Sequence, residues 1–138
     1  MLKAKWWKVL SFLLLLYTCT YGFIVKIPKL DDRMRESIRN MFFHVPMWFG
    51  MMILFFVSLF YAIKYLRSGN PIHDVYSYSY ASMGLVFGIL GIITGAFWAN
   101  YQWGSPWVGD PKQNGAAIAL LIYFAYFVLR GSLIDMEK

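Results

Sequence analysis

One histidine stands among apolar residues in the segment Phe42-Phe43-His44-Val45-Pro46, where a long apolar run begins. An imidazole in such surroundings can cap a helix or lie at a membrane interface, or it can serve as an axial ligand to heme iron. A single histidine cannot complete a structural zinc site, which takes four protein ligands. If His44 binds a metal, the pattern therefore favours iron held in a porphyrin.

A second candidate is the stretch 98–112, which contains Trp98, Trp103 and Trp107 together with one tyrosine, two glycines and two prolines. Glycine and proline at this density interrupt both helix and strand, so we expect an irregular loop. Flat aromatic side chains on a stiff loop suit either a flat apolar ligand or the water–lipid interface. A simple interfacial belt needs no such backbone, so the composition favours a shaped platform.

Charged residues accompany both segments. Arg39 and Lys112 are either ordinary flanking charges of membrane helices or partners for the carboxylates of an anionic ligand. Asp110, directly before a proline, is suited to begin a turn or cap the next helix. The sequence offers no nucleophile–base pair, no paired carboxylates and no glycine-rich phosphate loop. We therefore expect a binding protein and not an enzyme.

The elements that must position these residues are membrane spans. Hydrophobic residues make up 59% of the 138-residue chain and charged residues 14%, against about 45–50% and 25% in soluble domains. The mean hydropathy is +0.51. The net charge of +6 does not indicate nucleic-acid binding, because the basic residues lie in short segments between apolar runs. The composition predicts an all-α polytopic membrane protein surrounded by lipid.

Four apolar runs define the predicted transmembrane helices, at about residues 9–25, 45–63, 79–99 and 113–134, in one membrane domain covering 1–138. Each approaches the length of about 20 residues that crosses a bilayer. We expect the first run to be an uncleaved span and not a signal peptide. A short helix is predicted over 31–40, and Ser68-Gly69-Asn70-Pro71 predicts a turn. Glycines in the third span predict close helix packing: Gly84, Gly88, Gly91 and Gly95.

The number of crossings places the candidate residues relative to the membrane. His44 precedes the second span and the Trp-rich loop follows the third, so both must lie at one membrane face, and His73 at the other. With the N-terminus inside, seven basic residues lie inside and six outside, so the positive-inside rule favours this orientation only slightly. We predict a cytoplasmic N-terminus and an outer site.

Two motifs together resemble a known family. Phe43-His44-Val45-Pro46 before one span, and Trp103-Gly104-x-x-Trp107-x-x-Asp110 between two later ones, are similar to the heme exporter protein C family (CcmC) of cytochrome c maturation. That family belongs to a heme-handling superfamily with a tryptophan-rich "WWD" loop. The resemblance extends over about 37–134, and the order of elements agrees throughout.

The resemblance implies that the protein binds heme b at the periplasmic face of the bacterial inner membrane. It would present the heme to the chaperone CcmE, with CcmD and the transporter subunits CcmA and CcmB assisting. His44 would be an axial ligand of the iron, and Trp103, Trp107 and Asp110 would form the platform. Arg39 and Lys112 fall where the family has basic residues near the site.

The chain departs from the family pattern in two respects. Pro106 and Gly109 stand where the family loop usually has aromatic residues. The family also has about six spans and a second axial histidine, whereas this chain has four spans. We expect either a truncated sequence, which is the interpretation we favour, or a short variant that draws its second ligand from a partner or another subunit. The alternative function is a non-heme structural or lipid- or quinone-binding subunit whose tryptophans are interface anchors.

Overall fold

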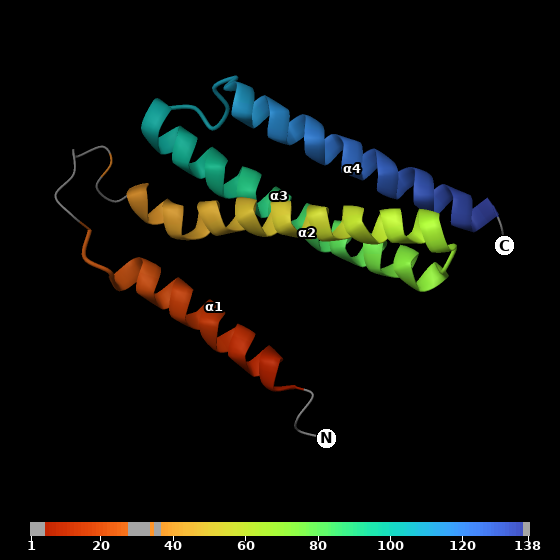
Figure 1. Cartoon of the computed structure of the whole chain (residues 1–138). Coiled ribbons are helices and arrows are strands. Elements are labelled where there is room, and N and C mark those ends of the chain that lie inside the picture. Colours follow the sequence, from red (N-terminus) through yellow and green to blue (C-terminus); the bar gives the residue numbers. More distant parts are fainter. Residues whose placement is uncertain (1–4, 28–33, 35–36, 137–138) are drawn as a thin grey trace.

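The structure is a computed structural model, and it describes residues 5–27, 34 and 37–136. Four α-helices and one short 3-10 helix make up nearly all of this part of the chain (Figure 1). They are α1 (Trp6–Ile24), the 3-10 helix η2 (Ser37–Asn40), α2 (Met41–Ser68), α3 (Pro71–Trp103) and α4 (Pro111–Met136). Four helical segments, with η2 and α2 counted as one, are long and apolar enough to cross a membrane. The predicted all-α fold is confirmed.

The helices are longer than most of the predicted spans. The second span was expected at 45–63 and the third at 79–99, whereas α2 covers Met41–Ser68 and α3 covers Pro71–Trp103. An apolar run marks only the part of a helix that suits hydrocarbon. The backbone hydrogen bonds continue into the polar and aromatic residues on either side, until a residue that ends the helix is reached.

The turn between α2 and α3 follows the local sequence, as predicted. Gly69 ends α2 in the left-handed conformation with φ 65°, and its N–H donates to the carbonyl of Tyr65 over 2.8 Å. The side chain of Asn70 then accepts from the N–H of Ile72 at 3.1 Å, and Pro71 occupies the first helical position of α3. Two residues therefore reverse the chain and lay α3 along α2.

Helices α2 and α3 are the main packed pair, and they lie side by side in Figure 1. Glycines make this approach possible, as predicted: a methyl group added at Gly84 would lie 2.6 Å from the ring of Phe55, and one at Gly50 would lie 2.5 Å from the ring of Phe87. The buried hydroxyl of Ser58 also donates to the carbonyl of Ser77 at 2.8 Å. Small residues and interhelical hydrogen bonds associate helices in lipid, where apolar burial provides little driving force.

The loop between α3 and α4 is shorter than expected. The prediction placed it at 98–112, but α3 continues through Trp103 and α4 begins at Pro111, so the irregular segment is 104–110. No glycine or proline interrupts 98–103. Gly104 is the first residue that ends the helix, with φ 75° and its N–H donating to the carbonyl of Asn100 over 2.9 Å.

Helix α1 meets the rest of the molecule at its C-terminal end and diverges from it toward the N-terminus (Figure 1). Gly22 is buried there, and the rings of Phe23 and Phe43 lie 5.4 Å apart. The segment before α2 was predicted as a helix over 31–40. Residues 31–33 and 35–36 lie outside the described residues, and Ser37–Asn40 form a 3-10 helix.

Candidate functional site

A cavity of about 470 Å³ opens between α2, α3 and the segment that joins α3 to α4. Its lining combines one imidazole, four indole rings and small residues of α3 with polar groups from the start of α4. The lining includes His44, Trp48, Trp98, Trp103, Trp107 and Lys112. His44 and the tryptophan-rich segment thus share one end of the molecule, as the number of membrane crossings predicted.

Local sequence explains how α2 presents His44. The histidine lies in the first turn of α2, and Pro46, two residues later, lies inside the helix, where it has no N–H to donate to the carbonyl one turn before it. Opposite the histidine, α3 carries Gly95: a methyl group added there would lie only 2.8 Å from His44 Cε1. The glycine therefore provides the space that the imidazole occupies.

Hydrogen bonds hold both nitrogens of the His44 ring. Nδ1 lies 3.1 Å from the carbonyl oxygen of Gly91 and 3.1 Å from Thr94 Oγ1. Nε2 accepts from the indole N–H of Trp48 over 3.0 Å. Histidine and Trp48 are four residues apart on α2, so they lie on the same face of the helix, one turn from each other.

These partners determine the tautomer of His44. A carbonyl oxygen only accepts and an indole N–H only donates. The Thr94 hydroxyl donates to the carbonyls of Leu90 and Gly91, so its oxygen remains the acceptor for the histidine. The proton therefore sits on Nδ1, and Nε2 carries the lone pair. Metal-binding histidines commonly donate one ring N–H to a backbone carbonyl in the same way and coordinate through the other nitrogen.

The segment that carries Trp107 is tied to the first turns of α4. Gln113 accepts from the N–H of Val108 at 3.1 Å and donates to the carbonyl of Pro106 at 3.3 Å. Ser105 Oγ donates to the carbonyl of Trp107 at 2.8 Å. Backbone groups on both sides of Trp107 are thereby fixed, which gives the aromatic platform a defined shape although its rings are exposed.

Asp110 and Lys112 line the same cavity from the start of α4. The carboxylate of Asp110 accepts from the backbone N–H of Lys112 at 2.7 Å, so Asp110 caps the helix. This is one of the two roles expected from the Asp-Pro sequence. This capping bond uses only the backbone N–H of Lys112. The cationic side chain of Lys112 lines the cavity.

Arg39 is placed differently from the other five candidate residues. Its Nη1 donates to the carbonyls of Gly22 and Val25 at 3.1 and 3.0 Å, at the C-terminal end of α1. A cation at this position satisfies free carbonyls and complements the helix dipole. Arg39 lines a second hollow of about 390 Å³, and Trp98 lines both this hollow and the main cavity. The structure therefore does not bring Arg39 into the cavity with His44.

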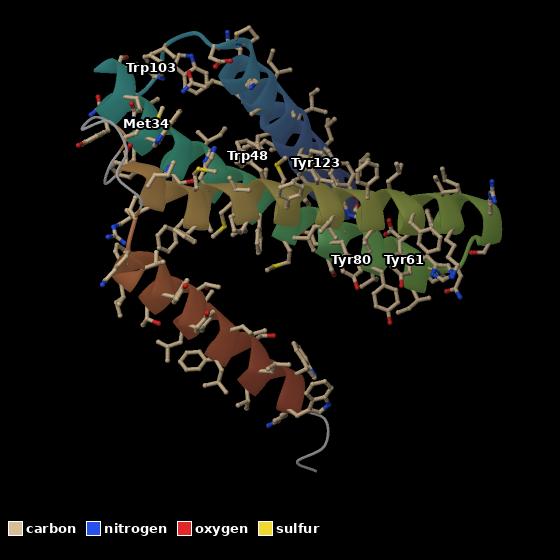
Figure 2. The ribbon with its side chains drawn as sticks, turned by 60° about the vertical axis from the view of Figure 1, so that its left-hand side comes forward. Met34, Trp48, Tyr61, Tyr80, Trp103 and Tyr123 are labelled. Atoms are coloured by element: carbon tan, nitrogen blue, oxygen red, sulfur yellow. The ribbon has the colours of Figure 1, made fainter. Side chains whose placement is uncertain are left out.

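Three residues of the cavity were missed from the sequence as functional candidates: Trp48, Gln113 and Gly95. Figure 2 shows Trp48 on α2 and Trp103 at the end of α3. The spacing of four between His44 and Trp48 was a usable signal, since residues i and i+4 are neighbours on a helix. The role of Gln113 follows only from the folded loop.

The fold defines a polytopic helical membrane protein, and an aromatic-lined cavity lies at one end of its spans. The sequence profile of the heme exporter protein C family (CcmC) matches residues 2–138. The chain belongs to this family.

Similar proteins carry names from cytochrome c biogenesis. The cytochrome c biogenesis protein CcsA of Trachelium caeruleum is 34% identical over 124 residues, which cover 88% of this chain and 37% of that protein. CcsA of Thermosynechococcus vestitus is 52% identical over 54 residues, 38% of this chain and 17% of that protein. A putative cytochrome c biosynthesis ccmC-like mitochondrial protein of Marchantia polymorpha is 26% identical over 93 residues, 67% of this chain and 41% of that protein.

The chain thus spans well under half the length of these curated relatives. No solved structure matches it.

Proposed function

We propose that this chain binds heme b in the cavity beside the Trp-rich loop and passes it on during cytochrome c maturation. The observation that carries the proposal is the setting of His44, which lines a cavity together with four indole rings and whose Nε2 carries the lone pair of the ring. Heme, if bound, would supply an iron atom that His44 could ligate through an imidazole nitrogen.

The residues present fit such a group. A volume of about 470 Å³ falls within the range of about 300–1,000 Å³ for small-molecule sites. Trp48, Trp98, Trp103 and Trp107 provide flat apolar surface for a macrocycle, and Lys112 is a partner for a propionate. Gly91 would keep His44 oriented by accepting its Nδ1–H, which is the arrangement that makes an imidazole nitrogen a better ligand.

Membership of the CcmC family supports the wider assignment. In this proposal the protein binds and transfers heme without chemical turnover. The cavity lies at the periplasmic face of the bacterial inner membrane, with the N-terminus in the cytoplasm. Its heme acceptor is CcmE, and CcmD, CcmA and CcmB are its other partners.

A reduced-minus-oxidised absorbance spectrum of the detergent-purified chain, with a pyridine hemochrome assay, tests the proposal. We expect a low-spin heme spectrum that His44→Ala weakens at least tenfold. The matched control, His73→Ala, removes a histidine at the other membrane face and leaves the spectrum unchanged. If His73 is required and His44 is not, the site has been assigned to the wrong end. If no porphyrin binds and Trp107→Phe is silent, the tryptophans are interface anchors of a non-heme subunit.

A further inference from the structure

Trp48 borders the cavity as one of its four indole rings, and its N–H also occupies the nitrogen on which the proposed heme site depends. Its indole N–H donates to His44 Nε2 over 3.0 Å, and the two rings meet edge to face with centroids 5.9 Å apart. A neutral imidazole has a single lone pair in the ring plane, on Nε2 in this tautomer. The hydrogen bond from Trp48 and a bond to iron therefore exclude each other.

The position of Trp48 is built into the packing of α2 on α3. A methyl group added at Gly91 would lie 3.1 Å from Trp48 Cε2, so the indole occupies the space that this glycine leaves open. Gly95 does the same for His44 one turn along α3. Two glycines four residues apart on α3 thus leave the space that Trp48 and His44 occupy. The carbonyl of Gly91 also accepts the Nδ1–H of His44.

We propose that Trp48 is a latch on His44: its N–H occupies Nε2 in the heme-free protein, is displaced when iron binds, and returns when heme leaves. The inference rests on the proposed function, because it requires His44 Nε2 to be the iron ligand. On binding, the Trp48 N–H···Nε2 hydrogen bond breaks and the iron–Nε2 bond forms. Nδ1 keeps its proton throughout, so no proton is transferred.

A latch of this kind is useful in a protein that must bind heme and then release it. Without heme, an unpaired ring nitrogen in a partly buried site would be costly. With the indole present, release of heme restores a hydrogen bond, which lowers the affinity and favours transfer. Trp48 is in this sense a positioning residue, acting on iron only through His44.

The test compares Trp48→Phe with wild type in a titration of the detergent-purified full chain with ferric heme, followed at the Soret band. Phenylalanine keeps a ring over Gly91 but lacks the N–H. We expect Trp48→Phe to bind ferric heme roughly three- to thirty-fold more tightly. It should also release heme to apomyoglobin more slowly by a similar factor. The matched control is Trp6→Phe, an exposed tryptophan of α1, which should change neither quantity.

A second measurement needs no heme. In the protein labelled with 15N-tryptophan, the Trp48 indole N–H resonance, assigned by its absence in Trp48→Phe, should move upfield in His44→Ala, because its acceptor is gone. An unmoved resonance would show that the hydrogen bond does not form, and would overturn the latch.

The outcomes separate the latch from the proposed function. If His44→Ala loses heme but Trp48→Phe binds with wild-type or weaker affinity, the iron site stands and the latch is wrong. If His44→Ala binds heme like the wild type, both are wrong. Tighter binding in Trp48→Phe that disappears in the double variant with His44→Ala supports both.

Discussion

The α2–α3 hairpin carries a histidine at each end, and the two ends are built differently. At one end, both ring nitrogens of His44 have polar partners and the ring borders a cavity of about 470 Å³. At the other end, His73 packs against the ring of Tyr61 with centroids 6.0 Å apart. Among the residues that the structure describes, its Nδ1 has no hydrogen-bond partner. Figure 2 shows the two ends, marked by Trp103 and by Tyr61 with Tyr80.

The His73 end is closed by side-chain contacts. Arg130 of α4 forms a bidentate ion pair with Asp74 of α3, with one N···O distance of 2.8 Å, and it also lies over the ring of Tyr78 at 4.9 Å. Tyr61 and Tyr80 stack nearby with nearly parallel rings. The Arg130 contacts join α4 to α3, and the tyrosine stack joins α2 to α3. One end of the molecule therefore has a cavity lined by aromatic side chains, and the other end is closed by contacts between helices.

The largest effect is expected from Gly95→Ala, which should weaken heme binding at the cavity end. The added methyl would lie 2.8 Å from His44 Cε1, and the imidazole cannot move without breaking its bonds to Gly91, Thr94 and Trp48. We expect heme affinity to fall about 10- to 100-fold, measured by ferric heme titration. Gly115→Ala is the matched control, because open space surrounds Gly115. Equal heme affinities in Gly95→Ala and Gly115→Ala would mean that the space beside Gly95, which His44 occupies, is not needed for heme binding.

A smaller effect, on stability alone, is expected at the opposite end. Asp74→Asn or Arg130→Gln leaves one charge without its partner and should lower the free energy of unfolding in detergent by about 1–3 kcal/mol. The double variant should lose less than the sum of the two, because each substitution removes the same interaction. Heme affinity should stay at the wild-type level. A parallel loss of affinity would show that the two ends are coupled and would break the comparison.

The smallest effect concerns the two cations predicted from the sequence. Lys112→Gln should weaken ferric heme binding roughly two- to three-fold, as expected for one exposed charge pair. The loss should vanish with heme dimethyl ester, whose propionates carry no charge. Arg39→Gln should leave both affinities unchanged, because Arg39 binds the carbonyls of Gly22 and Val25. A larger loss of heme affinity in Arg39→Gln than in Lys112→Gln would indicate that Arg39 contributes to the heme site.

Much of the architecture was predictable because it depends on composition and on the number of membrane crossings. A continuous apolar run of about 20 residues crosses the bilayer core as a helix, because the helix satisfies its backbone polar groups within the run. Counting crossings then places His44 beside the Trp-rich loop and His73 at the far face. The turn at Gly69 and Asn70 and the cap at Asp110 were also visible, since their chemistry involves residues no more than four apart.

What only the tertiary structure decided depends on how one helix is rotated and shifted against another. The acceptors of Arg39 lie 14 and 17 residues away at the C-terminal end of α1, and the backbone acceptor for His44 Nδ1 lies 47 residues away in α3. Neither follows from spacing along one segment. The sequence by itself determined which residue types meet at each membrane face. The packing of α2 on the glycines of α3 decided which nitrogen of His44 carries the lone pair and which indole covers it, because a tautomer is set by partners in space.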